Sequence, residues 1–215
     1  MATVETLAKN ETFECSRELI MNTSADQVWE WLANLRNVMT ANQFHSSIDC
    51  DDVVARNPKV GFEVPILHNM LEREFYRIAR ITRFEDYEIA WGERIPDDAG
   101  YADMFPHSEG WRVESLGPRQ CRVSNRLRGR FMSPLGQLIG KQAWDAAIPV
   151  ILDNDLQDVA LAVGAVEKKR DIAMPIASAA LLRLTNARQI DGISVSEFVS
   201  MQAHLLKHTP PESNA

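Results

Sequence analysis

The order of hydrophobic patterns along the chain constrains its fold more than any other feature. A strand-like segment at residues 13–21 and a helix-like segment come first, and a long run of strand-like segments follows. The last of these, at 121–131, leads almost directly into a helix-like stretch from about 134 to 167. A lone long helix that follows a curved sheet packs most simply across the concave face of that sheet. The order therefore predicts an α+β fold, with a curved antiparallel sheet wrapped around a long C-terminal helix and a cavity between them.

The predicted strand at 121–131 shows the clearest alternation. One of its faces is apolar apart from Asn125, and the other carries arginine and serine. This pattern is typical of an antiparallel strand with one covered and one solvated face. The arginines could form a functional basic stripe, but a solvated outer face paired with acidic side chains of neighbouring strands is the favoured interpretation. Further strands are predicted at 48–55, 61–68, 74–84, 88–95 and 110–116.

Two short helices are predicted between the first strand and the rest of the sheet. Ser24 is placed to cap the first helix, with Gln27 three residues on as its capping-box partner. A second short helix is expected within residues 36–44.

Pro149 divides the predicted long helix into two parts that need not share a face, because proline tends to kink a helix. N-terminal to it the helix is rich in alanine and glycine. These small residues would leave room for a ligand over the sheet, and close helix–sheet contact explains them equally well. C-terminal to Pro149, aliphatic residues at helical spacing form an apolar stripe: Leu152, Leu156, Val159, Val163 and Val166.

Composition argues against several classes of protein. The net charge of −7 disfavours nucleic acid or an anionic membrane as the main partner. No apolar run is long enough to span a bilayer, and the N-terminus lacks the apolar core of a signal peptide. The three cysteines, Cys15, Cys50 and Cys121, are far apart and are interpreted as reduced core residues. These features predict a cytoplasmic protein.

Most of the chain resembles a known superfamily. Residues 16–29, Ser-Arg-Glu-Leu-Ile-Met-Asn-Thr-Ser-Ala-Asp-Gln-Val-Trp, form a strand that ends in a small polar turn, followed by a helix that begins with an acid and a Val-Trp pair. Together with residues 121–127 and the long helix after them, this segment resembles the START-like (SRPBCC) superfamily of helix-grip proteins, which includes polyketide cyclases and dehydrases. The resemblance covers residues 10–167 and implies a helix-grip fold. The superfamily shares no catalytic residues, so the resemblance assigns none.

Residues 178–208, after a linker at 168–177, are similar to the short C-terminal domain called SHOCT. Gln202 and the Val-Ser pair at 195–196 depart from the usual pattern, which has basic and acidic residues there. Such domains are thought to mediate oligomerisation, so the resemblance implies a helical hairpin through which the chain forms a homo-oligomer. The residues that carry the similarity are Leu181, Leu184, Gly192, Ile193, Ser194, Glu197, Phe198, Leu205 and Leu206.

No short motif predicts a cofactor or a metal site. The Gly-x-x-x-Gly-Lys segment at 136–141 is one residue short of a phosphate-binding loop, and Gln142 stands where Ser or Thr is required. His204 and His208 have helical i, i+4 spacing that could bind a metal ion, but solvated residues near a helix end are the favoured interpretation. The expectation is therefore no cofactor and no metal.

The candidate ligand-binding residues are polar or aromatic groups expected inside the fold. Arg17 and Asn125 interrupt otherwise apolar strand faces, and a buried arginine needs a carboxylate partner or a ligand anion. Two histidines and a tyrosine are expected to line or gate the cavity, and tryptophans to form its apolar wall. For each residue the alternative is a satisfied core or rim position. The full set is Arg17, His45, His68, Tyr76, Trp91, Trp111, Asn125 and Trp144.

The sequence favours a protein that binds or carries a hydrophobic small molecule, lipid-like or polyketide-like, between the sheet and the long helix. The alternative is an enzyme of the polyketide cyclase or aromatase type, acting on a poly-carbonyl substrate in the same cavity. That enzyme needs an acid–base pair close to the substrate, and His68 with Tyr76 or Arg17 is the candidate. A titratable pair inside the cavity would favour the enzyme, and an apolar cavity with one buried polar group would favour the carrier.

Overall fold

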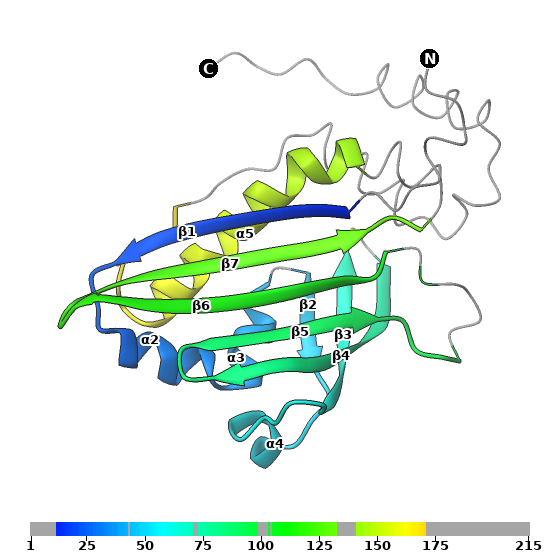
Figure 1. Cartoon of the computed structure of the whole chain (residues 1–215), viewed down its shortest axis with the longest axis horizontal. Coiled ribbons are helices and arrows are strands. Elements are labelled where there is room, and N and C mark those ends of the chain that lie inside the picture. The colour runs from blue at the N-terminus through cyan, green and yellow to red at the C-terminus, as the bar shows by residue number, and fades with distance from the viewer. Residues whose placement is uncertain are drawn as a thin grey trace.

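The computed structural model describes residues 12–42, 44–70, 73–98, 103, 105–132 and 141–170. These residues form a seven-stranded antiparallel sheet with the strand order β1-β7-β6-β5-β4-β3-β2 (Figure 1). The strands are β1 (Thr12–Met21), β2 (His45–Ile48), β3 (Glu63–Met70), β4 (Arg73–Glu85), β5 (Glu88–Arg94), β6 (His107–Gly117) and β7 (Gln120–Arg130). The helices are α2 (Ala25–Leu32), α3 (Leu35–Thr40), α4 (Asp52–Arg56) and α5 (Lys141–Ala162).

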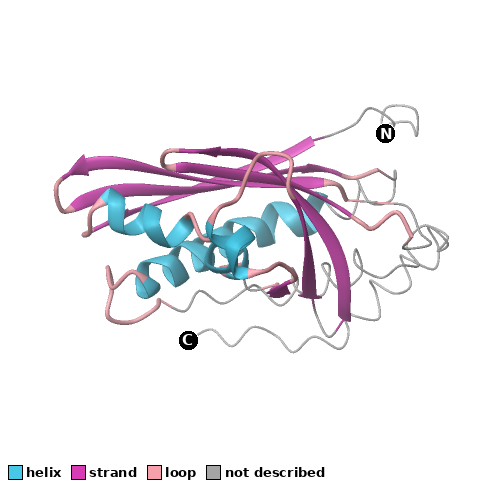
Figure 2. Cartoon of the chain, turned by 90° about the horizontal axis from the view of Figure 1, so that it is seen from below, coloured by secondary structure: helices cyan, strands magenta, loops and turns pink. Residues whose placement is uncertain are grey.

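The sheet forms one layer, and the helices lie in a second layer against its concave face. Figure 2 shows this arrangement edge-on, with strands at one end of the sheet curling towards the helices. The long helix α5 packs on β1 and β7, α2 packs on β6 and β7, and α3 packs on β2. The predicted α+β helix-grip architecture is therefore confirmed for the described residues.

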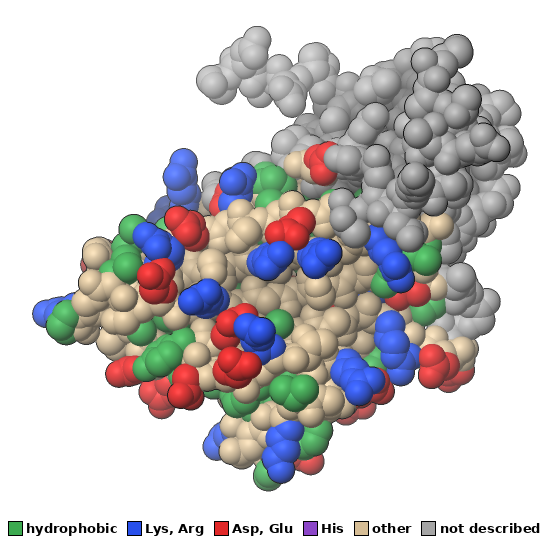
Figure 3. All heavy atoms as spheres, viewed as in Figure 1, with side chains coloured by type: hydrophobic (Ala, Val, Ile, Leu, Met, Phe, Trp, Pro, Cys, Tyr) green, Lys and Arg blue, Asp and Glu red, His purple; other side chains and the backbone are tan. Residues whose placement is uncertain are grey.

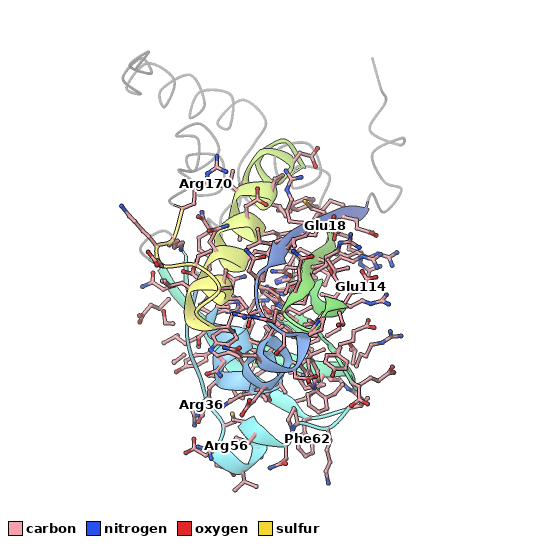
Figure 4. The ribbon with its side chains drawn as sticks, turned by 90° about the vertical axis from the view of Figure 1, so that its left-hand side faces the viewer. Glu18, Arg36, Arg56, Phe62, Glu114 and Arg170 are labelled. Atoms are coloured by element: carbon pink, nitrogen blue, oxygen red, sulfur yellow. The ribbon has the colours of Figure 1, made fainter. Side chains whose placement is uncertain are left out.

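The convex face of the sheet is solvated and carries paired charges. Arg122 lies 2.8 Å from Glu114 on β6 and 3.7 Å from Glu18 on β1. Arg126 lies 2.7 Å from Glu14 on β1. Figure 3 shows basic and acidic side chains interspersed over this face, and Figure 4 shows Glu114 on the side of the sheet away from α5. The arginine row of β7 is thus the paired outer face that the alternation favoured.

The apolar stripe of α5 is buried against the sheet as predicted, with Leu152, Leu156 and Val159 at 0–1% exposure. Pro149 lies inside the helix, which continues through it. Asp155 is not part of the stripe, and it is nevertheless fully buried. Because Asp155 is buried too, the buried surface of α5 is wider than its apolar stripe.

The start of α2 follows the sequence prediction in part. Ser24 is the N-cap, and its hydroxyl accepts a hydrogen bond from the backbone N–H of Gln27 at 3.2 Å. The Gln27 side chain does not complete a capping box within the described contacts. Its amide instead donates to the carbonyl of Val163 at 2.9 Å, which ties α2 to the end of α5.

The prediction of a strand at residues 48–55 is wrong for most of that segment. β2 ends at Ile48, and residues 52–56 form the short helix α4. Asp51 caps this helix, because its carboxylate accepts a hydrogen bond from the backbone N–H of Val54 at 2.8 Å. An aspartate at this position favours a helix start over a continued strand.

Several predicted segments lie outside the described residues. These are the beginning of the long helix at 134–140, most of the linker at 168–177, and the hairpin at 178–208. Within the described part of the chain, no helix combines the length and the apolar character that crossing a bilayer requires.

Candidate functional site

Alternation along β5 and β6 places two tryptophan–glutamate pairs on the covered face of the sheet. Trp91 and Glu93 point inward from β5, and Glu109 and Trp111 point inward from β6. All four residues are 0–3% exposed. Because the strands are antiparallel, Trp91 lies opposite Glu109 in the register. Two carboxylates are therefore buried side by side under the helix layer.

Three imidazoles and a guanidinium surround the carboxylate of Glu93. The Nε2 atoms of His68 and His107 lie 3.1 and 3.3 Å from its Oε2 atom. The Nε2 atom of His45 lies 3.7 Å from Oε1, and the Nε atom of Arg77 lies 3.4 Å from Oε2. The five groups come from the adjacent strands β2, β3, β4, β5 and β6, one from each. The curl of the sheet brings them to one point.

Each of the three imidazoles is oriented by a backbone carbonyl. A carbonyl oxygen only accepts hydrogen bonds, so the contacting Nδ1 atom carries the proton and Nε2 is the atom turned towards Glu93. The pairs are His45 with Met39, His68 with Ile66 at 3.4 Å, and His107 with Phe105 at 3.0 Å.

Arg77 is held mainly by groups other than Glu93. Its Nη2 atom lies 3.0 and 3.3 Å from the two carboxylate oxygens of Asp103. The same nitrogen donates to the backbone carbonyls of Glu93 at 3.2 Å and Phe105 at 3.1 Å. Asp103 therefore supplies a counter-charge for this buried guanidinium.

The environment keeps Glu93 ionised and His45 neutral. Burial acts to raise the pKa of Glu93, but the interactions with the three imidazoles outweigh burial and hold this pKa well below its ordinary value. Burial lowers the pKa of His45 to about 4, although the charge of Glu93 acts in the opposite direction.

Among the described residues, the hydrogen-bond donors to Glu109 are all neutral. Its Oε1 atom accepts from the Trp111 indole and the Asn125 amide, both at 3.1 Å, and its Oε2 atom accepts from Asn42 at 3.5 Å. Burial, and then the negative charge of Glu93, raise the pKa of Glu109 to about 7, and the neutral donors only partly oppose this rise. This carboxyl group can gain or lose a proton near neutral pH.

An aromatic cluster adjoins the polar groups. Phe75 stacks on His68 with a ring separation of 5.2 Å, and Phe105 lies 5.0 Å from His107. Phe105 also stacks on Phe13 at 5.1 Å and on Phe131 at 4.8 Å. The side of the sheet beside α5 thus combines aromatic surface with a few convergent polar side chains.

Five of the predicted site residues are brought together here: His45, His68, Trp91, Trp111 and Asn125. Arg17 is not among them. It projects from the edge strand β1, its side chain is 44% exposed, and its Nε atom lies 3.6 Å from Asp153 on α5. It has the expected carboxylate partner, but at the rim of the sheet and not in its interior.

Tyr76 is a correction, because it is 52% exposed on the outer face of β4. Its neighbour Arg77 takes the inward position, since successive residues of a strand point to opposite faces. Tyr76 therefore does not form an internal acid–base pair with His68. Trp144 lies on α5, and its side chain is outside the described part of the structure.

Four residues of the site were missed: Arg77, Glu93, His107 and Glu109. A usable signal was present, because Glu93 is in phase with Ile89 and Trp91, as Glu109 is with Trp111. A polar or charged residue in phase with apolar residues on a strand is the same signal that singled out Arg17 and Asn125.

A surface pocket of about 190 Å³ lies elsewhere, between the start of α2 and the turn that joins β6 and β7. Asp26 and Tyr87 line it, and the Tyr87 hydroxyl donates a hydrogen bond to the Asp26 carboxylate. It is separate from the buried carboxylates.

Comparison with known proteins identifies the fold through structure alone. No protein family model matches the chain, and no curated protein matches it in sequence. Solved structures do match. The chain is similar to the ZhuI aromatase/cyclase from Streptomyces sp. R1128, with 14% identity, a TM-score of 0.56, and coverage of 72% of this chain and 94% of that one.

Two further structures give the same result. A START superfamily protein from Mycobacterium smegmatis is 13% identical with a TM-score of 0.51, and the match covers 70% of this chain and 97% of that one. Norcoclaurine synthase from Thalictrum flavum, in complex with dopamine and hydroxybenzaldehyde, is 11% identical with a TM-score of 0.51, and the match covers 80% and 96%. The chain therefore has a START-like helix-grip fold.

Proposed function

We propose that the protein binds a small, largely apolar molecule between the concave face of its sheet and α5. The observation that carries this proposal is the aromatic cluster next to convergent, buried polar side chains. Small-molecule sites typically have apolar and aromatic walls with a few polar groups that fix orientation. Phe75 and Phe105 provide such a wall directly beside His68 and His107.

The cost of burying these polar groups supports a functional role. Replacing a buried set of charges with well-packed apolar residues is often neutral or stabilising, so such a set is weak support for stability alone. One of the similar structures is named an aromatase/cyclase, and another is a synthase solved with the small organic molecules dopamine and hydroxybenzaldehyde. This likeness supports the proposal through the fold they share with this chain.

A displacement assay tests the proposal. An apolar fluorescent dye is bound to the purified protein and displaced with long-chain fatty acids or aromatic polyketides, while native mass spectrometry of freshly purified protein detects a ligand that co-purifies. Phe75→Ala should weaken dye binding up to about tenfold, because an aromatic contact contributes about 0.5–1.5 kcal/mol. Phe84→Ala is the matched control, since Phe84 is also partly buried on the same strand but packs against Trp29.

Two results would contradict the proposal. One is a folded wild-type protein that binds none of these molecules. The other is an equal loss of dye binding in Phe75→Ala and Phe84→Ala, because a ligand beside His68 contacts only the first ring.

The cyclase-type enzyme is the second candidate function, and the carboxyl group of Glu109 favours it. A general acid–base group is most effective when its pKa lies near the working pH, and the pKa of Glu109 is raised to about 7. Incubation with a poly-carbonyl substrate should then give a dehydrated product by mass spectrometry. Glu109→Gln should abolish this product while dye binding persists. If wild type and Glu109→Gln form the same product at the same rate, Glu109 is not the acid–base group.

Residues 178–208 are proposed to mediate self-association in the cytoplasm, in keeping with their similarity to short oligomerisation domains. The free thiols of Cys15, Cys50 and Cys121 fit a reducing compartment. Removal of residues 178–215 should lower the mass measured by light scattering, and an unchanged oligomeric state would contradict this role.

A further inference from the structure

The group around Glu93 contains an unusual concentration of hydrogen-bond acceptors. In a neutral imidazole only one nitrogen carries a proton, and in His45 and His68 that proton is on Nδ1, which faces a backbone carbonyl. When both rings are neutral, their Nε2 atoms present lone pairs to the Glu93 carboxylate, which is also an acceptor. At N···O distances of 3.1–3.7 Å these lone pairs repel each other unless a proton or a metal ion lies between the atoms.

The side chains of the three proposed ligands are shielded from solvent. The side chains of His45, His68 and Glu93 are 2%, 3% and 0% exposed. Among the described residues, the Oε2 atom of Glu93 makes no hydrogen bond of acceptable geometry. Arg77 approaches this oxygen, but its Nη2 atom is bonded to Asp103 and two carbonyls. Asp103 offsets the charge of Arg77, so the negative charge of Glu93 remains available to another cation.

The distances match those of a metal site. Ligand atoms bonded to Zn²⁺ at 2.0–2.1 Å in a tetrahedron are separated by about 3.3 Å. The Nε2 atom of His68 is 3.1 Å from a Glu93 oxygen, and that of His45 is 3.7 Å from the other. One ligand atom from each of the three residues can be chosen so that all lie within 4.8 Å of one another. One ion can therefore contact all three side chains after small rotations.

The surroundings are also those expected of a metal site. Histidines that bind metals usually donate their second ring N–H to a carbonyl or carboxylate, and His45 and His68 do so. His107 has the same contact between Nδ1 and a carbonyl, and its Nε2 atom lies 3.3 Å from Glu93, directly beside the proposed ligands. The three ligands stand on strands of one sheet, β2, β3 and β5, which fixes their relative positions.

We infer that His45, His68 and Glu93 bind a divalent first-row transition-metal ion through two imidazole nitrogens and a carboxylate. This donor set suits Zn²⁺ and Fe²⁺, and three protein ligands leave a coordination position for water or for a bound molecule. The inference does not depend on the proposed small molecule. It departs from the sequence expectation of no metal, which rested on short motifs, whereas these ligands are distant in sequence.

The experiment uses the full chain, stripped with a chelator and then titrated with Zn²⁺ against a chromophoric competitor. One ion should bind per chain. Loss of a residue that only supports a metal ligand typically weakens metal binding by about 10–100-fold, and His107→Gln should weaken Zn²⁺ binding by an amount in this range. His68→Gln and Glu93→Gln each remove a ligand and should weaken Zn²⁺ binding by more than that. The double variant His204→Gln/His208→Gln is the control, because that pair has metal-binding spacing in the sequence but is not among the proposed ligands. Loss of binding only in this control would overturn the inference.

A second measurement needs no substitution, so it is independent of whether the variants fold. In protein labelled with ¹⁵N-histidine, Zn²⁺ should shift the Nε2 resonances of two rings whose Nδ1 atoms stay protonated. Ring signals that do not respond to one equivalent of Zn²⁺ would overturn the inference. The cluster would then be one in which protons alone separate the imidazoles from Glu93.

Discussion

Glu93 and Glu109 are two buried glutamates on neighbouring strands, and they differ mainly in what surrounds them. Each is at most 3% exposed, and each accepts a hydrogen bond from the indole of a tryptophan two residues away on its own strand. Glu93 faces three imidazoles and a guanidinium, whereas the described donors to Glu109 are two amides and that indole.

The difference teaches that burial alone does not set the charge of a carboxyl group. Desolvation acts to raise the pKa of both residues. Basic neighbours reverse this effect at Glu93, where the pKa falls well below its ordinary value. Neutral donors cannot reverse it at Glu109, where the pKa rises to about 7 and the charge of Glu93 adds to the rise. Glu93 therefore keeps its negative charge, whereas Glu109 can gain or lose a proton near neutral pH.

Substituting each glutamate with glutamine should give the largest contrast in stability. Glu93→Gln removes the negative charge that the three imidazoles face and leaves Arg77 with Asp103 alone among the described carboxylates. Removing one partner of a buried ionic group costs about 3–5 kcal/mol in the free energy of unfolding. Glu109→Gln keeps the shape and removes a disfavoured charge, so its cost at pH 7 should stay below about 1 kcal/mol, or the variant should be more stable.

Denaturant unfolding of both variants at pH 7, with chelator present, measures the two free energies without a contribution from bound metal. Circular dichroism before the titration establishes that each variant is folded. Equal losses of stability in the two variants would mean that the neighbours of the two carboxylates do not distinguish them.

The pH dependence of stability sharpens the comparison at Glu109. Its pKa is raised from 4.5 to about 7 by folding, so between these values the folded protein holds a proton that the unfolded chain has lost. Stability from this group is therefore fully present below pH 4.5 and declines as the pH rises to 7. At about 1.4 kcal/mol per pH unit, the decline amounts to about 3 kcal/mol.

Glutamine does not titrate, so subtracting the unfolding free energy of Glu109→Gln from that of the wild type isolates this contribution. The difference should fall steadily from pH 4.5 to 7 and then become constant. If the unfolding free energies of the two proteins change in parallel with pH over this interval, Glu109 ionises with its ordinary pKa.

The architecture was predictable because it depends on patterns that span whole elements. The alternation of β7 and the Leu/Val stripe of α5 each repeat over several turns or residue pairs, and one exception does not hide them. The region at 48–56 was misread because a single residue, Asp51, decides between a continued strand and a new helix.

The site was predictable only in part, since it depends on how five strands meet. Alternation places His68, Trp91 and Asn125 inside, but it does not show that His45 and His107 point at the same carboxylate. Arg17 and Arg77 are both in phase with apolar residues on their strands. The edge position of β1 lets Arg17 reach the rim, whereas β4 lies within the sheet and Arg77 stays buried.

Substituting Trp91 and Trp111 tests the smallest expected difference between Glu93 and Glu109. Trp91→Phe removes the indole donor 2.9 Å from Glu93, and Trp111→Phe removes the donor 3.1 Å from Glu109. Both rings are 0–1% exposed, so the two substitutions remove similar buried volume and their packing costs largely cancel in the difference. At pH 6 the hydrogen bond to ionised Glu93 should contribute about 1.5–3 kcal/mol, and the bond to protonated Glu109 about 0.5–1.5 kcal/mol. Above pH 8 Glu109 is also ionised, and the two costs should converge. A difference in unfolding free energy that stays constant between pH 6 and pH 8 would contradict the assignment of opposite protonation states to the two carboxyl groups.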